Sequence, residues 1–453
     1  MRRLGKLSYI LIKERKQTRF LLALGITVGV LTGLVSSFYV ISIHSLQHGR
    51  RYLLDLFPQS LIWQWGLSII IAIVFLVVGI WIVRRFAPQA GGSGIHEVEG
   101  FLCGKRSMIW YKVLPFKFVA SSFAIASGIV LGREGPSIHM GAAVGKMISS
   151  RFKVKSEYTH VLVAAGAGAG LAAAFNAPLS GILFVIEEMH SHFNYNFKSL
   201  QCVVVACFFS VFVLRMFMGQ APDIPMQHFP APPLESFWIF ALFGVLFGIL
   251  GFMFNRYLVS FLNYFGKLNS KSFWKHVVIS AAVIGILLQV YPDATGGGYI
   301  FAPRVLAFQV PVLALFLLFF IRMIGVWIFC GMGAPGGLLE PMLALGICMG
   351  MWFGWFAHLW FPALILEPGV FAVAGMGALL AATVGAPLTG IVIVVEMTMN
   401  YALILPLIIT CFSASMTSYI LGGSPLYEIL LERTLSLDEK KRKEQITNNA
   451  VPK

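Results

Sequence analysis

The sequence has few charged residues: only 12% of its 453 positions are Asp, Glu, Lys or Arg, whereas 58% are hydrophobic. Its mean hydropathy is +0.82, which is typical of a chain that lies in a bilayer. Apolar runs near the length of the hydrocarbon core occur at about 20–44, 61–83, 201–218, 236–254, 310–333 and 402–421. The scarcity of charge excludes a soluble globular protein and predicts a polytopic membrane protein.

The sequence also lacks the patterns of several other classes of protein. Its six cysteines are scattered without Cys-x-x-Cys spacing, so we expect small core residues. No metal-ligand pattern occurs, and the glycine-rich stretch 166–170 follows no strand, so we expect neither a metal nor a bound cofactor. The net charge is +15, but the basic residues flank apolar runs and are not interleaved with stacking aromatics, which argues against nucleic acid as a partner.

Basic residues mark the two ends of the chain. Seven Lys or Arg residues precede the first apolar run, and Lys440 to Lys443 follow the last one. By the positive-inside rule we expect both termini in the cytoplasm and an even number of crossings. The first apolar run is too long and too late for a cleavable signal, so residues 1–19 are expected to be retained as a basic cytoplasmic segment. A charged cytoplasmic tail is expected at 431–453.

The two halves of the sequence resemble each other. The stretch 165–187 recurs as 374–396 with about fourteen of twenty-three positions identical, and Pro178 matches Pro387. We therefore expect two homologous transmembrane repeats, and we favour inverted repeats because an anion site between two opposed broken helices follows from them. The expected bounds are 20–218 for the first repeat, 219–235 for the linker and 236–430 for the second repeat.

Glu134 lies in the loop Gly132-Arg133-Glu134-Gly135-Pro136, inside an apolar stretch. A carboxylate at membrane depth is unfavourable unless it has a function. The glycines let the backbone approach a small ligand, and Pro136 suits the first turn of a helix, whose free N–H groups attract an anion. The loop thus binds an anion, or the Glu134 carboxylate in its place, and we interpret Glu134 as a gate. The alternative for these five residues alone is a tight turn with an Arg-Glu pair.

Three further segments carry donors that suit a weakly held anion. Gly91-Gly92-Ser93-Gly94-Ile95 is a glycine turn with one hydroxyl, residues 333–341 form a second break before a helix, and Tyr427 follows Ser424-Pro425-Leu426. Hydroxyl and amide donors bind a partly dehydrated anion without trapping it, as full positive charges would. Taken singly, each segment is also consistent with a loop glycine cluster, or for Tyr427 with an interfacial anchor.

Together these segments resemble the CLC family of chloride channels and proton-coupled chloride exchangers, in particular its bacterial exchangers, from about residue 93 to 427. The resemblance rests on four stretches: Gly92-Ser93-Gly94-Ile95, Gly132-Arg133-Glu134-Gly135-Pro136, Gly333-Ala334-Pro335-Gly336-Gly337, and Asn400-Tyr401 to Pro406 after Glu396. The motif glycines are Gly92, Gly94, Gly132, Gly135, Gly336 and Gly337. The resemblance implies an all-α fold of two repeats with tilted, discontinuous helices.

The resemblance also implies roles for single residues. The hydroxyls of Ser93 and Tyr427 would hold a central chloride together with the backbone amides of Leu338 and Leu339. Glu134 would be the external gate. The family further implies a homodimer with one pore in each subunit.

Glu188, in Ile186-Glu187-Glu188-Met189, matches the inner glutamate through which the family's exchangers pass protons. The alternative is a solvated carboxylate that faces the cytoplasm. Because Glu187 has a counterpart in Glu396 of the second repeat, we expect Glu187 to have a structural role shared by both halves.

The sequence departs from the family pattern at two sites that could modulate transport. His96 stands where the family usually has proline, so a helix-starting residue is lost and a titratable group is added. In Leu338-Leu339-Glu340, an aromatic residue of the family is absent and a glutamate follows the anion-binding amides. An ionised Glu340 facing the pore would repel chloride, so we expect it to be protonated, paired or turned to the outer solvent.

The resemblance implies a secondary active antiporter that exchanges chloride for protons, in the inner (plasma) membrane of a bacterium. The residues after Tyr427 are too few for the nucleotide-sensing CBS domains of many relatives. The alternatives are an uncoupled chloride channel, a fluoride exporter of the same family and, from another class, an intramembrane hydrolase that uses His190-Ser191-His192. The presence of both Glu134 and Glu188 favours exchange, so we expect a transporter and not an enzyme.

Overall fold

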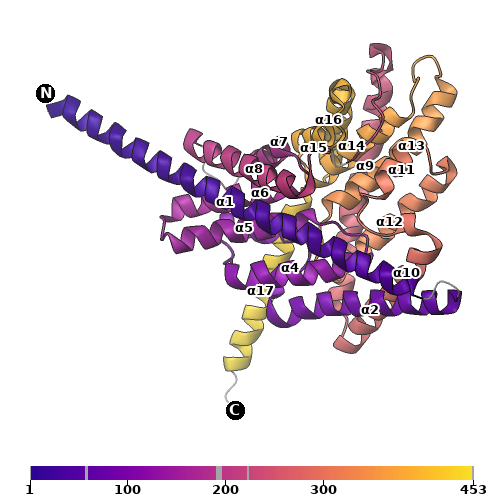
Figure 1. Cartoon of the computed structure of the whole chain (residues 1–453), viewed down its shortest axis with the longest axis horizontal. Helices are drawn as coiled ribbons and strands as arrows, with labels where there is room; N and C mark the ends of the chain where they lie inside the picture. Colours follow the sequence, from indigo (N-terminus) through magenta and orange to yellow (C-terminus); the bar gives the residue numbers. More distant parts are fainter. Residues whose placement is uncertain (1, 57–59, 190–195, 222–223, 451–453) are drawn as a thin grey trace.

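The computed structural model describes residues 2–56, 60–189, 196–221 and 224–450, and within these ranges the secondary structure consists of helices without strands (Figure 1). The α-helices of the first half are α1 (Arg2–Asp55), α2 (Leu61–Phe86), α3 (Ile95–Leu102), α4 (Trp110–Ala126), α5 (Glu134–Arg151), α6 (Ser156–Ala174), α7 (Pro178–Glu188) and α8 (Phe197–Met218). Those of the second half are α9 (Phe237–Lys267), α10 (Ser270–Val290), α11 (Phe301–Leu306), α12 (Val312–Gly331), α13 (Leu339–Trp360), α14 (Gly369–Val384), α15 (Pro387–Thr398), α16 (Ile404–Ile420) and α17 (Leu426–Ala450). Short 3-10 helices lie at η1 (Pro88–Ala90), η3 (Leu234–Ser236), η4 (Pro292–Ala294) and η5 (Tyr401–Leu403).

The packing of the first eight helices is repeated in the next eight. The helix pairs α5/α6, α6/α7, α6/α8 and α1/α8 pack together in the first half, and α13/α14, α14/α15, α14/α16 and α9/α16 are their counterparts in the second half. The matched sequence stretches lie in α6–α7 and α14–α15. The internal repeat is therefore a repeat of structure as well as of sequence.

Glycines bring the central helices into close contact. A Cβ atom added to Gly166 of α6 would collide with the carbonyl oxygen of Gly141 in α5, and one added to Gly375 of α14 would collide with that of Gly346 in α13. Small residues at such crossings are how membrane helices approach closely without a hydrophobic driving force. Every residue of α14 is buried, so this helix lies at the centre of the bundle.

Two glutamates connect the repeats reciprocally. Glu187, near the end of α7, accepts hydrogen bonds from the backbone N–H groups of Leu388 (3.0 Å) and Thr389 (2.7 Å) at the start of α15. Glu396, near the end of α15, accepts equivalent bonds from Leu179 (3.1 Å) and Ser180 (2.8 Å) at the start of α7. Since the end of each helix meets the start of the other, the equivalent helices run antiparallel.

The reciprocal contacts of Glu187 and Glu396 establish the direction of the repeats and the role of Glu187. The repeats are inverted, because equivalent helices of parallel repeats would point the same way through the membrane. The structural role expected for Glu187 from its repeat counterpart is found: its carboxylate satisfies N–H groups that a helix start leaves without an intrahelical partner. Pro178 and Pro387 occupy the first position of α7 and α15, where a missing N–H is harmless.

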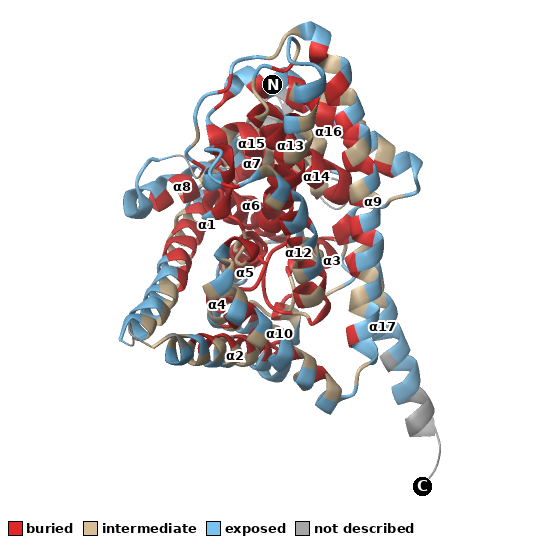
Figure 2. Ribbon diagram, turned by 90° about the vertical axis from the view of Figure 1, so that its right-hand side faces the viewer, coloured by how far each residue is buried: buried red, intermediate tan, exposed pale blue. Residues whose placement is uncertain are grey.

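Buried residues concentrate in the middle of the molecule, around α5, α6 and α13–α15, and exposed residues lie on the peripheral helices (Figure 2). Many of the exposed residues are large and apolar, such as Phe208 and Phe212 of α8 and Phe412 and Met416 of α16. Among the described residues, eight helices are long and apolar enough to cross a membrane. The outer surface therefore suits a lipid environment, as the composition predicted.

The segment bounds expected at residues 19 and 430 coincide with no break in the chain. α1 continues from Arg2 to Asp55, and α17 includes both Tyr427 and the start of the charged tail. The connection between α8 and η3 falls at the expected linker, residues 219–235. The division into cytoplasmic and transmembrane segments stays a prediction.

Candidate functional site

The three glycine motifs meet at one place in the fold. The N–H of Gly92 donates to the carbonyl of Gly333 (3.2 Å), and the N–H of Gly336 donates back to Gly92 (3.3 Å). Gly132 and Gly337 exchange two backbone hydrogen bonds of 2.8 and 2.6 Å as an antiparallel bridge. Segments more than 200 residues apart are thus held together by backbone contacts.

Three helices begin at this junction: α3 after Gly94, α5 after Arg133 and α13 after Leu338. Gly94 has a positive φ of 89°, a conformation that favours glycine, and it directs the chain into α3. The first N–H groups of each helix have no intrahelical acceptor and carry partial positive charge. Converging helix starts make a site for an anion without a full positive charge.

Ser93 and Tyr427 bring hydroxyl groups to the junction from distant parts of the chain. Their side chains are buried, and the two hydroxyls lie close together without a hydrogen bond of good geometry to each other or to another described group. A Cβ atom added to Gly135 would lie 2.5 Å from Ser93 Oγ, so this hydroxyl faces the start of α5. Buried hydroxyls without partners are unfavourable, and an anion between them would satisfy both.

Tyr427 lies on α17, and an ion pair and a hydrogen bond connect this helix to other parts of the protein. Arg106 lies 2.6 Å from Glu97 of α3 and also contacts Asp438 of α17. Arg433 of α17 donates to the carbonyl of Leu262 in α9 (2.8 Å). These contacts fix the helix that presents the tyrosine.

Glu134 is fully buried, and its carboxylate binds the helix starts. Oε1 accepts from the N–H of Arg133 (3.2 Å), and Oε2 accepts from the N–H of Glu340 (3.3 Å). The carboxylate therefore occupies a position where donors for an anion converge. This geometry is the one expected of a tethered anion that competes with a free one.

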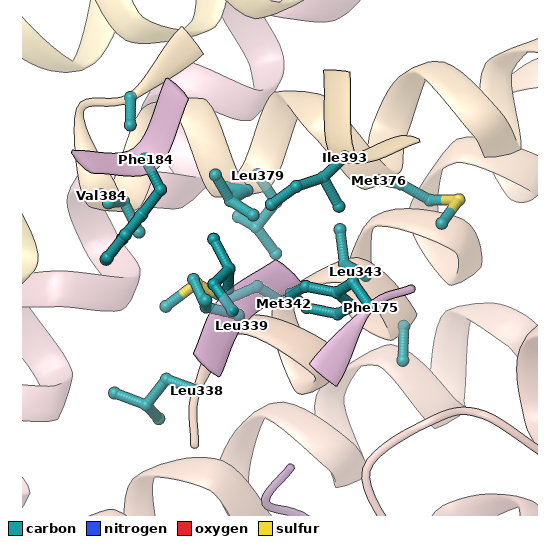
Figure 3. Close-up of a cluster of buried hydrophobic side chains, with 14 of the residues drawn as sticks. Phe175, Phe184, Leu338, Leu339, Met342, Leu343, Met376, Leu379, Val384 and Ile393 are labelled. Atoms are coloured by element: carbon teal, nitrogen blue, oxygen red, sulfur yellow. The ribbon is translucent and has the colours of Figure 1, made fainter. Parts of the chain in front are cut away.

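Leu338 and Leu339 are buried on either side of the start of α13. Figure 3 shows the Leu339 side chain in a cluster with Met342 and Leu343, and the Leu338 side chain pointing away from that cluster. Because both side chains pack against other apolar groups, the backbone N–H groups of this turn are the donors that it offers to an anion.

Glu340 lies beside Glu134. Its Oε1 accepts from the N–H of Tyr299 (3.0 Å), and its own backbone N–H donates to Glu134 Oε2 (3.3 Å). The side chain also lines a cavity of 510 Å³ together with Arg133 and Tyr299. Glu340 thus lies at the boundary between the gate and the cavity, and its protonation state stays a prediction.

Glu188 faces a second buried carboxyl group. Its half-buried side chain lies near Glu99 in α3, which is 3% exposed. Both interpretations of Glu188, the proton-passing glutamate and the solvated carboxylate, stay predictions. The sequence reasoning missed Glu99, although the rule that singled out Glu134, a carboxylate near apolar segments, applies to Glu99 as well.

Two basic residues, Lys117 and His96, lie beside the turn that contains Ser93. Lys117 of α4 was missed by the sequence reasoning; it is fully buried and donates to the carbonyls of Ala90 (3.0 Å) and Gly92 (2.6 Å), so it holds the turn in place. His96, expected as a modulator, lies in the first turn of α3, 4.0 Å from Glu97. The junction is thus supported by a cation on one side and by α3 on the other.

No group of three or more His, Cys, Asp or Glu residues in the described part of the chain could hold a metal ion. The six cysteines are free, and five are buried. The residues of the hydrolase hypothesis, 190–192, lie outside the described residues.

An inverted-repeat helical fold with an anion site between helix starts and buried carboxyl groups beside it defines an ion-transporting membrane protein. Residues 73–419 match the family described as voltage gated chloride channel. The chain belongs to this family, as its motifs predicted.

Relatives with high similarity are exchange transporters. The H(+)/Cl(-) exchange transporter ClcA of Vibrio parahaemolyticus is 42% identical over 96% of this chain and 95% of its own length. The protein of the same name from Vibrio cholerae is 44% identical over 91% of this chain and 89% of its own length. The crystal structure of a slow cyanobacterial Cl-/H+ antiporter has a TM-score of 0.89 at 38% identity and covers 92% of this chain and 98% of that one. Their similarity spans nearly the whole fold.

Proposed function

We propose that this protein is a secondary active antiporter that exchanges chloride for protons across a membrane. The observation that carries the proposal is the separate positions of two carboxyl groups. Glu134 lies at the anion site among helix starts, and Glu188 lies apart from it beside Glu99. An exchanger needs one group that competes with the anion and one that handles protons alone. The names of the similar exchange transporters support exchange over an uncoupled channel.

In this mechanism Glu134 alternates between two states. When ionised, its carboxylate binds the N–H donors of Arg133 and Glu340 and excludes chloride from them. When protonated, it binds these donors more weakly, so chloride replaces it. Chloride then binds between the Ser93 and Tyr427 hydroxyls and the first turn of α13. Because one set of donors serves both anions, movement of chloride is coupled to movement of a proton.

Transport requires no cofactor in this mechanism, since the only groups used are carboxyls, hydroxyls and backbone amides. The placement that we propose is the inner membrane of a bacterium, with both termini in the cytoplasm where their basic residues are favoured. We further propose a homodimer with one pore per subunit. The exposed aromatic faces of α8 and α16 lie in equivalent positions of the two repeats and supply a surface for a second copy.

The experiment is reconstitution into liposomes loaded with chloride. Wild-type protein should move protons against their gradient when chloride flows down its own. Glu134→Ala should keep chloride flux and lose proton movement, because the site then lacks the competing carboxylate. Proton pumping by Glu134→Ala would contradict the gate, and chloride flux without proton movement in the wild type would identify an uncoupled channel.

A further inference from the structure

The contact between Glu134 and Glu340 combines two acidic groups at a place where one would suffice for a gate. Both side chains project from the first turn of a helix, Glu134 from α5 and Glu340 from α13. The Gly132–Gly337 bridge holds the two helix starts together. The backbone N–H of Glu340 donates to Glu134 Oε2 (3.3 Å). A Cβ atom added to Gly132 would collide with Glu134 Oε2 and would lie 2.7 Å from Glu340 Cβ, so the two side chains lie side by side. The bridge therefore fixes the backbones from which both side chains project.

Two carboxylates in contact cannot both be ionised at neutral pH unless cations compensate them. The charged and titratable groups that face the pair are few. They are Arg133 and Tyr299 beside it, Arg322 of α12 behind it, Tyr39 of α1, and across the cavity His44, Arg50, Arg51, Asp55, Asp293 and Arg304.

The nearest of these cations are engaged elsewhere. Arg322 donates to four carbonyl groups in residues 293–297, at 2.7 to 3.0 Å. The Arg133 guanidinium lies over the Tyr299 ring at 4.1 Å and donates to the carbonyl of Ala174 (3.3 Å). A shared proton neutralises one charge of the pair while both guanidinium groups keep these backbone partners.

Only one member of the pair reaches the cavity. Glu340 lines the 510 Å³ cavity and is 8% exposed, whereas Glu134 is completely buried and does not line it. A proton that passes from the cavity to Glu134 along the contact of the two side chains therefore meets Glu340 first.

We propose that Glu134 and Glu340 share one proton, and that Glu340 is the group through which the gate exchanges protons with the cavity. The inference rests on the proposed function and adds a second proton-binding residue to it. In the transfer, the Glu340 carboxylate takes a proton from a hydronium ion in the cavity, which becomes water, and passes the proton to the Glu134 carboxylate. Glu340 is left ionised, ready for the next proton.

The test uses Glu340→Gln, which keeps an oxygen for the Tyr299 N–H but binds no proton. Without a neighbouring negative charge, Glu134 holds its proton less tightly, and chloride flux depends on a protonated gate. The pH of half-maximal chloride flux should therefore shift to acid by about one unit. Glu340→Ala should shift it in the same direction. The control is Asp55→Asn, which removes a carboxylate that lines the same cavity from an exposed position.

A second background separates proton sharing from a structural effect. In Glu134→Gln protein the gate cannot titrate, so adding Glu340→Gln should leave the pH profile unchanged. A shift that persists in this background, or the absence of a shift in both Glu340 variants, would overturn the inference. Failure of the proposed function is a different result, because wild-type protein itself would then fail to couple chloride to protons.

Infrared spectroscopy provides a measurement that needs no transport. A protonated carboxyl group has a C=O stretching band separate from that of a carboxylate. At pH 7 the wild type should show one protonated carboxyl more than Glu340→Gln, and Asp55→Asn should match the wild type. Equal carboxyl bands in wild type and Glu340→Gln would show that no proton is shared.

Discussion

At the scale of single residues, this protein places polar groups in an apolar interior, and those at the centre of the site bind backbone groups. The Glu134 carboxylate has two backbone N–H partners, and the Lys117 ammonium has two carbonyl partners. Several buried polar atoms have no hydrogen-bond partner among the described groups, and of these the hydroxyls of Ser93 and Tyr427 lie beside the helix starts. Because unsatisfied buried groups are unfavourable, these two residues are where a missing ligand is expected.

The first prediction concerns these hydroxyls. Ser93→Ala and Tyr427→Phe each remove one donor to the anion, and a hydrogen bond to a charged group contributes about 1.5–3 kcal/mol. Chloride affinity should fall by roughly tenfold or more in each variant, as measured by calorimetric titration. The control is Ser122→Ala, whose hydroxyl donates to the carbonyl of Phe118 (2.8 Å) in its own helix. Unchanged affinity in both variants would place the anion elsewhere.

A second prediction concerns Glu188. Because it contacts Glu99 and is apart from the helix starts, Glu188→Gln should block proton movement while chloride still binds. Proton flux in liposomes should fall to the background level, and chloride titration should give the wild-type affinity. Normal exchange by Glu188→Gln would contradict this prediction and support the alternative, that Glu188 is a solvated carboxylate.

At the scale of helices, the structure depends on how their ends are satisfied. α7 and α15 are short, with 11 and 12 residues, and each receives a carboxylate at its first turn from the other. Their contact links the two repeats across the internal symmetry. The matched glutamates Glu187 and Glu396 thus link the two repeats structurally.

The third prediction follows from this link. Glu187→Ala leaves the N–H groups of Leu388 and Thr389 without their acceptor and should lower the free energy of unfolding by about 2 kcal/mol. Glu396→Ala should have a similar effect, because its contacts with α7 are equivalent. Thermal unfolding in detergent measures both, with exposed Glu235→Gln as the control. The proton-to-chloride ratio of Glu187→Ala should stay that of the wild type, and a lost ratio would give Glu187 a role in transport.

At the scale of the whole molecule, the inverted repeats bring the starts of α5 and α13 together at the centre. From Lys16 to Arg51, α1 extends over about 50 Å at 1.5 Å per residue, well beyond a hydrocarbon core of about 30 Å. This length is enough to cross a membrane, so with the cytoplasmic N-terminus that we propose, Arg51 would lie on the outer side.

A fourth prediction tests the orientation. In a Cys103→Ser background, Lys16→Cys and Lys440→Cys should react with a membrane-impermeant thiol reagent only from the cytoplasmic side. Arg51→Cys, at the other end of α1, should react only from outside. The five remaining native cysteines are buried, so the background protein is the control. Labelling of Lys16→Cys in intact cells would reverse the proposed orientation.

Composition and motifs predicted the all-helical membrane fold, the two repeats and the family, because these depend on hydropathy and on local glycine and proline patterns. The site was anticipated at Glu134, Ser93 and Tyr427 by motif. Glu99 and Lys117 were missed, since their importance lies in burial against groups that are distant in sequence. The roles of all these residues stay predictions until they are measured.

The sequence by itself determined that this chain lies in a membrane, that its halves are related, and that a glycine-hinged carboxylate lies in an apolar stretch. Only the tertiary structure decided that equivalent helices run antiparallel, since a repeat in sequence carries no direction in space. It alone decided that Glu340 faces Glu134 and not open solvent. The physical reason is that the Gly132–Gly337 bridge joins two helix starts about 200 residues apart, and no local pattern encodes a contact over that separation.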